Sequence, residues 1–299
     1  MRERYAAVRR MLECVEKHLD SPLSLKELSE EAGYSPFHAS RLFREIVGIP
    51  PGDYLRARRL SQAAQRLRDT RKSILEISLD TAFESHEGFS RAFKRQFGLT
   101  PENYRKDVPP IPLFLPRVSK EHFLDFLKGE SPNMDNKPQP IFVQVIEKPV
   151  RKIILKRGRK ATHYFEYCEE VGCDVWGVLT SIKDAIFEPL GLWLPDKMRT
   201  KGTSEYAQGV EVGLTYSGPI PEGMELIELA ACRMMVFQSQ PYKDEEMGKV
   251  IGFIQGAIET YQPSVFGYEW ADEEAPRFQL CPIPERGYIE GRPVRKVAR

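Results

Sequence analysis

The chain has 299 residues, 41% of them hydrophobic and 29% charged, a composition typical of about two globular domains. It contains no run of 18 apolar residues, and its first residues lack the uninterrupted apolar core of a signal peptide, so neither a membrane span nor a secretion signal is expected. The five cysteines lie apart, with no Cys-x-x-Cys pair. This pattern predicts reduced thiols in a cytoplasmic protein without a metal site.

Charge is unevenly distributed along the chain. Residues 1–107 hold 20 Lys and Arg against 16 Asp and Glu, whereas the remainder has a small acidic excess. Within residues 41–72 the count is nine basic to three acidic. A basic stripe in an almost neutral protein is typical of a part that binds a polyanion such as nucleic acid. The alternative is an ordinary solvated helix face, which a run such as Arg56, Arg58 and Arg59 would also form.

Residues 24–56 and 73–105 are two copies of one sequence repeat with a period near 50. The copies share a Ser-x-x-Glu box, a Ser-Arg-x-Phe step, a glycine, a proline and a tyrosine. The matched pairs are Ser24 with Ser73, Ser40 with Ser90, Gly48 with Gly98, Pro51 with Pro101 and Tyr54 with Tyr104. The second copy has one extra residue, just before its second helix or early in it.

Each copy predicts two short helices joined by a tight turn. The Ser-x-x-Glu boxes cap the first helix of each copy, and the second helices are expected over 36–47 and 86–97. A turn followed by a helix that carries Arg41 or Arg91 is the plan of a helix-turn-helix motif, although a single copy would also fit a plain helical hairpin. Residues 51–69 predict a long basic helix that spaces the two motifs by one DNA turn, about 34 Å.

The stretch GFSRAFKRQFGLTPENYR at 88–105 resembles the signature of the AraC/XylS family of transcriptional regulators. The stretches AGYSPFHASRLF and YLRARRLSQAA resemble the Rob/MarA/SoxS branch of that family. The resemblance covers residues 5–106 without a gap. It implies an all-α domain over 1–106 that binds double-stranded promoter DNA as a monomer through two helix-turn-helix motifs, with RNA polymerase as a further expected partner.

Carried over position by position, the resemblance implies a base-facing set made of Phe37, Ser40, Arg41, His86, Glu87, Gly88 and Arg91. Arg41 and Arg91 are the strongest candidates because a guanidinium can fork to the O6 and N7 atoms of guanine. Phe37 either contacts a thymine methyl or packs in the core. Ser40 and the run 86–88 depart from the glutamine-rich residues of the branch, so the preferred DNA sequence is expected to differ. The residues expected to touch phosphate or solvent are Arg44, Ser90, Lys94 and Arg95.

The rest of the chain predicts a linker and a second domain. Residues 107–140 hold seven prolines and are expected to form a linker with one short helix over 119–128. Strands are then expected at 142–150, 151–159, 209–216, 224–229, 232–239 and 276–283, and helices at 161–172, 174–188 and 243–261. Because similar patterns recur over 141–217 and 224–297, residues 141–299 predict an α+β domain of two similar halves around an antiparallel sheet.

Aromatic residues are concentrated in this second domain. Most are expected to be core, yet an aromatic cleft with one carboxylate is also how proteins hold lipophilic cations. The candidate effector-binding residues are Tyr164, Trp176, Tyr206, Glu211, Tyr268, Glu269 and Trp270. Glu211 alternates with Val210 and Val212, so it either closes such a pocket or faces solvent.

The stretches GVEV at 209–212, FGYEWADEEAPRFQL at 266–280 and ERGYIEGRPV at 285–294 resemble the GyrI-like small-molecule-binding family, the effector domain of Rob-type and BmrR-type regulators. The resemblance implies duplicated βαββ halves with a pocket between them that receives hydrophobic cations, as in a multidrug response. Where cation-binding members carry a pocket glutamate, this chain reads Phe278-Gln279-Leu280. The acid is then supplied by Glu211 or Glu269, or the ligand is not cationic.

Two other functions remain open at this point. In the first, the GyrI-like domain hydrolyses reactive small molecules, with Glu211 acting beside Tyr164 or Trp270. In the second, the protein is an architectural DNA-binding factor without a ligand. Because the five histidines are scattered and no Ser/His/Asp set is evident, no catalytic residue, metal or cofactor is expected and the protein is not expected to be an enzyme.

Overall fold

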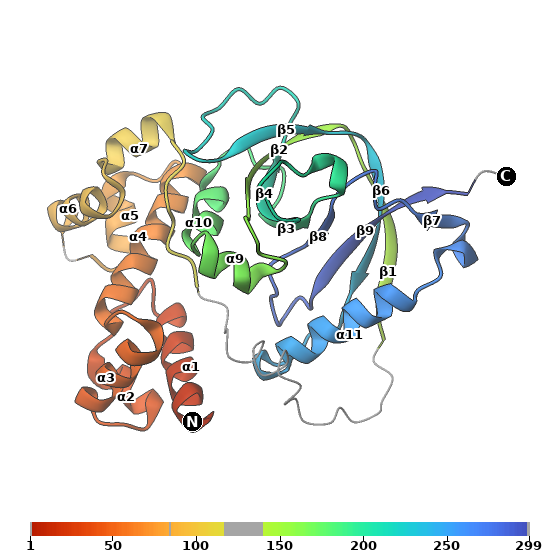
Figure 1. Ribbon diagram of the computed structural model, residues 1–299. Helices are drawn as coiled ribbons and strands as arrows, with labels where there is room; N and C mark the ends of the chain where they lie inside the picture. The colour runs from red at the N-terminus through yellow and green to blue at the C-terminus, as the bar shows by residue number, and fades with distance from the viewer. Residues whose placement is uncertain (1, 84, 117–139, 298–299) are drawn as a thin grey trace. The chain divides into compact units, whose positions relative to one another are not determined.

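The computed structural model describes residues 2–83, 85–116 and 140–297, which fall into two compact units, 1–116 and 117–299. The first unit is helical. Its helices are α1 (Arg2–Lys17), α2 (Leu25–Ala32), α3 (Pro36–Val47), α4 (Pro51–Asp69), α5 (Ile74–Asp80), α6 (His86–Phe97) and α7 (Pro101–Asp107), coloured red to yellow in Figure 1. The two predicted second helices and the long connecting helix are confirmed as α3, α6 and α4, and the predicted helix over 119–128 lies outside the described residues.

Local capping explains where these helices start and stop. The Ser24 hydroxyl accepts a hydrogen bond from the Glu27 amide at 3.2 Å, and the Glu27 carboxylate accepts one from the Ser24 amide at 2.7 Å. Ser73 and Glu76 form the same reciprocal pair. Both capping boxes were predicted, and they satisfy amides that the first helical turn leaves without partners. The extra residue of the second copy falls at position 84, outside the described residues.

The turn between the two helices differs between the copies. Gly33, after α2, has φ of 72°, a left-handed conformation that glycine adopts without steric cost. Ala82, the matched residue after α5, has φ of 53°, where its Cβ crowds the following carbonyl. The second copy therefore holds a strained turn that the first copy avoids.

Replacing Ala82 by Gly is expected to raise the free energy of unfolding by up to about 1 kcal/mol, because the left-handed strain is removed at some cost in unfolded-chain entropy. The matched change Gly33→Ala is expected to lower it by about 1 kcal/mol, since a Cβ at this position meets no atom within 4 Å and only the backbone conformation resists it. Urea denaturation of both variants measures this; a destabilised Ala82→Gly protein would contradict it.

Each helix-turn-helix motif has its own buried core, and α4 contributes to both. Tyr54, at the start of α4, packs in the first core with Phe43 of α3. Leu60 and Leu67, further along α4, pack in the second core with Phe93 of α6. A helix anchored in two cores keeps the spacing between α3 and α6 fixed.

Arginine side chains of α4 also form ion pairs and hydrogen bonds that hold the helical unit together. Arg58 forms a bidentate ion pair with Glu16 at 2.8 Å and donates to the Phe114 carbonyl at 2.7 Å. Arg66 binds both carboxylate oxygens of Asp20, at 2.8 Å, and donates to the Asp80 carbonyl at 3.0 Å. Because Asp20 precedes the first motif and Asp80 ends α5, Arg66 ties the segment before the first motif to the second motif.

The first unit extends beyond the boundary expected near residue 107. Ile111 and Leu113 are buried in the second core, and Phe114 packs against the first core. Burial of these apolar side chains holds the segment against the two cores. The segment 108–116 is therefore part of the helical unit, whereas residues 117–139 lie outside the described residues.

The second unit contains a nine-stranded sheet in the order β1-β6-β9-β8-β3-β4-β2-β5, with β7 paired to β9. The strands are β1 (Phe142–Lys148), β2 (Arg151–Arg157), β3 (Leu190–Trp193), β4 (Tyr206–Val212), β5 (Glu225–Leu229), β6 (Cys232–Gln238), β7 (Tyr268–Trp270), β8 (Arg277–Gln279) and β9 (Ile289–Lys296). The helices are α9 (Tyr164–Glu170), α10 (Asp174–Ser181) and α11 (Met247–Thr260), with short 3-10 turns at 196–198, 244–246 and 263–266. Described pairings between the named strands are antiparallel, and β3 meets β8 at the centre of the sheet.

Helices α9 and α10 and helix α11 lie over different ends of this sheet (Figure 1). The helix expected over 174–188 ends at Ser181, and Ala185 instead forms an isolated antiparallel bridge with Val212, the last residue of β4. The strand expected over 209–216 runs from Tyr206 to Val212. Strands β3, β7 and β9 were not predicted. No helix in the described residues is long and apolar enough to cross a membrane.

Candidate nucleic-acid interface and ligand site

Helices α3 and α6 are built alike. Each has 12 residues, a serine N-cap and a left-handed glycine at its end. Their buried positions fall at a constant offset of 50 residues: Ala39, Leu42, Phe43 and Val47 in α3, and Phe89, Ala92, Phe93 and Phe97 in α6. Because the buried faces match, the outward faces match as well, and residues 50 apart occupy equivalent places on the surface.

The outward face of α3 holds the residues predicted for the first motif. Phe37 is 80% exposed, so it is not a core residue and its ring is available to a ligand. Arg41 and Arg44 are exposed, and Ser40 is partly exposed. The predicted side chains line a shallow cavity of about 650 Å³ with Glu45 and Pro50.

The outward face of α6 presents Arg91, whose side chain is 76% exposed and lies 3.9 Å from the Glu87 carboxylate. Lys94 is also exposed, while His86 and Gly88 are partly exposed. The Ser90 hydroxyl is buried and has no hydrogen-bond partner within the described residues. Arg91 occupies the same place on α6 as Arg41 on α3.

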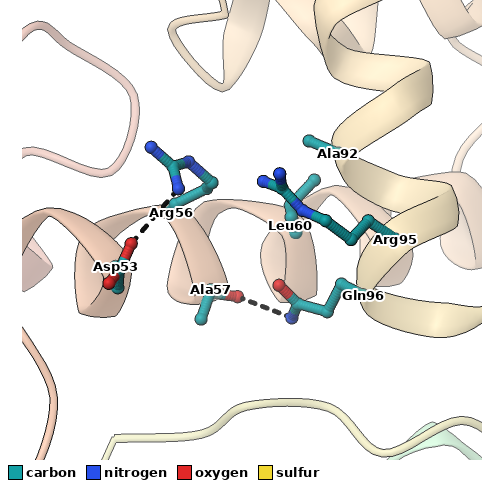
Figure 2. A pocket seen from close by; sticks show the side chains of 7 residues that line it. All are labelled: Asp53, Arg56, Ala57, Leu60, Ala92, Arg95 and Gln96. Atoms are coloured by element: carbon teal, nitrogen blue, oxygen red, sulfur yellow. Dashed lines mark hydrogen bonds and ion pairs between the residues drawn. The ribbon is translucent and has the colours of Figure 1, made fainter.

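A groove between α4 and α6 adds basic residues that were not in the predicted base-facing set. The cavity measures about 400 Å³, and Figure 2 shows Arg56 of α4 and Arg95 of α6 at it. Gln96 donates to the Ala57 carbonyl at 3.3 Å, which fastens α6 to α4 beneath the groove. Arg56 pairs with Asp53 at 3.2 Å, whereas Arg95 makes no ion pair within the described part of the chain. Arg95 follows Arg91 by one helical turn, so the groove continues the exposed face of α6.

The comparison with known proteins decides the family of this unit. A family model described as a helix-turn-helix domain matches residues 28–107. The chain is 41% identical over 91 residues to the regulatory protein SoxS of Escherichia coli (strain K12), which covers 30% of this chain and 85% of SoxS. The chain belongs to the Rob/MarA/SoxS branch of the AraC family of transcriptional regulators. Its helical unit is the AraC-type DNA-binding domain.

Further relatives match the same share of the chain. The right origin-binding protein of Escherichia coli (strain K12) is 48% identical over 99 residues, which is 33% of this chain and 34% of that protein. The chain thus spans about a third of the length of that relative. A crystal structure of a transcriptional regulator with an AraC-type DNA-binding domain from Chromobacterium violaceum covers 34% of this chain and 92% of its own, at 30% identity and a TM-score of 0.32.

Most of the predicted aromatic effector residues of the second unit belong to two hydrophobic clusters that meet at Tyr164. Tyr206 of β4 packs against Tyr167 and Trp193, with ring centroids 5.7 and 5.5 Å apart. Tyr164 packs against Trp176 at 5.9 Å, and it also borders both the cluster that contains Tyr206 and the cluster against which Tyr268 and Trp270 pack. Tyr268, Glu269 and Trp270 lie on β7, where Glu269 pairs with Arg295 at 2.6 Å and Trp270 stacks on Arg292 at 4.3 Å.

Glu211 lies on the opposite face of β4 from Tyr206, because residues five apart along a strand point to opposite sides. Its carboxylate is buried and accepts hydrogen bonds from Lys148 at 2.7 Å and from Arg151 at 2.6 Å. Burial alone would raise the pKa of Glu211, but the two cations hold the pKa below its ordinary value. Glu211 is therefore an ion-paired carboxylate that the structure does not bring together with Tyr164 or Trp270.

A buried polar row that we did not predict crosses the centre of the sheet. Gln208, Gly191, Gln279 and Glu290 are successive cross-strand partners on β4, β3, β8 and β9, so they share one face. Both amide atoms of Gln208 are buried without a partner in the described residues. A Cβ at position 191 would clash with the Tyr206 hydroxyl, so glycine is required there.

Glu290 is the acidic centre of this row. Its side chain is fully buried; it accepts a hydrogen bond from the Tyr288 hydroxyl at 2.8 Å and pairs with Arg277 at 2.8 Å. Gln279 donates to the Tyr206 hydroxyl at 3.1 Å. Burial raises the pKa of Tyr206 and of Tyr288 well above the ordinary value, so both stay protonated donors. Had β9 been predicted as a strand, the two-residue spacing of Tyr288 and Glu290 would have placed both side chains on one face of the sheet.

Proposed function

We propose that the protein is a ligand-responsive transcriptional regulator whose two helix-turn-helix motifs enter successive major grooves of promoter DNA. The observation that carries this proposal is the equivalence of α3 and α6, each with an exposed arginine at its centre and both fixed to α4. Because one chain carries two recognition helices fixed to α4, it can cover two helical turns of DNA without forming a dimer. Arg41 and Arg91 would read guanine in the two grooves. Regulation of transcription makes RNA polymerase the expected further partner.

The groove between α4 and α6 fits a contact with the DNA backbone. When adjacent major grooves hold α3 and α6, the intervening phosphates cross the surface between them. Arg56 and Arg95 supply positive charge there from two different helices. At the place equivalent to Arg95, α3 carries Glu45, which pairs with Arg4 at 2.7 Å. The phosphate contact is thus specific to the second motif.

Replacing Arg95 by Ala is expected to weaken DNA binding almost equally on all sequences and to reduce the slope of log affinity against log salt by about 1, since one phosphate contact is lost. Fluorescence anisotropy at several salt concentrations measures both effects. Arg159→Ala, an exposed arginine of the second unit, is the charge-matched control. An unchanged salt slope in Arg95→Ala would remove this groove from the interface.

We further propose that the second unit is a GyrI-like effector domain. From one edge inward the strands are β1, β6, β9 and β8, and from the other edge they are β5, β2, β4 and β3. The two series meet at the central β3–β8 pair and have the same connectivity, which supports a duplicated arrangement. The buried row around Glu290 lies at that centre and offers one acid, two phenols and an unpaired amide to a small molecule. The hydrolase alternative rested on Glu211, and the two cations on that carboxylate favour a structural role instead.

Titration of the full chain with hydrophobic cations, followed by tryptophan fluorescence, tests the effector site. Trp193 lies 5.5 Å from Tyr206, so occupation of the row is expected to change its emission. The same titration with Glu290→Gln is expected to be silent at concentrations that saturate the native protein. A response that is identical in the native protein and in Glu290→Gln would place the effector elsewhere, and no response across a broad panel would favour the architectural alternative.

A further inference from the structure

Arg277, on β8, pairs with the acid of the buried polar row and is itself partly exposed. Its Nη2 atom lies 2.8 Å from the Glu290 carboxylate, which is fully buried, and its own side chain is 26% exposed. Its guanidinium lies 5.8 Å from the Trp193 ring. A cation held between an aromatic face and a buried carboxylate is the arrangement by which proteins bind organic cations.

Arg277 also has a second partner outside the row. Its Nη1 atom lies 3.2 Å from Glu259, near the end of α11, whose carboxylate is 60% exposed. Glu259 in turn lies 3.7 Å from Arg292 on β9. The guanidinium can therefore leave Glu290 and stay paired with Glu259 at the surface.

The fit of Arg277 in the row is incomplete. Its Nε atom is buried without a hydrogen-bond partner in the described residues, and the Gln208 amide of the row is unpaired as well. Burial of a polar group without a partner opposes the arrangement that buries it. Glu290, in contrast, cannot lose its cation without replacement, because an uncompensated buried carboxylate is strongly unfavourable.

From these contacts we propose that Arg277 is a resident cation that competes with the effector, and that the effector is an organic cation that takes its place on Glu290. This inference rests on the proposed effector site at the central row. Binding is an exchange of cations: the effector pairs with Glu290 over Trp193, and Arg277 leaves Glu290 and keeps its pair with Glu259. Because Glu259 belongs to α11, the exchange couples occupation of the row to that helix.

The test compares the full chain with two variants, using tetraphenylphosphonium as the probe and calorimetry as the measurement. Arg277→Gln removes the competitor and keeps a polar side chain, and it is expected to bind the probe about tenfold more tightly than the native protein, because the site no longer has to be vacated. Arg277→Lys keeps the charge but loses the forked geometry, so a smaller gain is expected. Arg295→Gln, an exposed arginine paired with Glu269, is the control and is expected to bind as the native protein does.

The outcomes separate the inference from the function on which it rests. Equal or weaker binding by Arg277→Gln, with native-like binding by the control, would overturn the exchange and leave the effector site in place. Absence of probe binding in all proteins would overturn the site as well. If Arg277→Gln unfolds without the probe, the inference requires that the probe raise its melting temperature more than that of the native protein; a smaller rise would contradict it.

Discussion

Replacement of Arg91 by Ala is expected to weaken binding of the full chain to its preferred duplex by about 1–3 kcal/mol, while binding to unrelated DNA changes little. The reason is geometric: Arg91 stands at the centre of the exposed face of α6, and its 3.9 Å contact with the exposed Glu87 is too weak to keep it from a guanine edge. Anisotropy titrations against the preferred duplex, duplexes with single base changes and unrelated DNA measure the specific and the non-specific affinity.

Arg41→Ala provides the matched variant, because Arg41 occupies the same place on α3. Each change is expected to relax base preference in one half of the site only, and the two affected halves lie one helical turn apart. Equal losses on every DNA sequence would mean that the arginines contact phosphate instead of bases.

Replacement of Phe93 by Ala is expected to lower the stability of the second motif by about 3–5 kcal/mol. Phe93 is fully buried and packs against the rings of Phe97 and Tyr104, with centroids 4.7 and 5.8 Å apart. The loss is expected to spread over α5 to α7, since these helices share the second core. Amide hydrogen exchange, read helix by helix, measures where protection is lost.

Phe43→Ala is the matched change in the first core, where Phe43 packs against Tyr54 at 5.6 Å. The two variants are expected to expose different motifs, because the cores are separate clusters, joined through α4 and through the segment 108–116. Uniform loss of protection over residues 2–116 in both variants would show instead that the helical unit unfolds as one block.

Most of the confirmed predictions rest on short-range sequence patterns at helix ends. Serine caps and terminal glycines fix helix ends through contacts within a few residues, so α3 and α6 were predicted with the bounds observed. The exposure of Phe37 could not be decided in this way, since an aromatic at that place suits a core equally well. Its 80% exposed fraction depends on how α3 packs against distant helices.

The second unit was harder to predict because its site depends on strand register. Tyr206 and Glu211 were grouped as one candidate pocket, yet residues five apart on a strand point to opposite faces, which would have been evident had β4 been predicted to begin at 206. Glu290 was missed because its environment comes from the pairing of β9 with β8 and from Arg277 on β8. Such cross-strand contacts leave no periodic pattern in the sequence.

The central claim is that one chain reads two successive major grooves through α3 and α6. Methylation interference at guanine N7, with the full chain on a duplex selected from a random pool, tests it most directly. The claim predicts two interfering patches on one face of the duplex, about 10 base pairs apart, of which Arg41→Ala removes one and Arg91→Ala the other. A single patch, or two patches that persist in both variants, would contradict it.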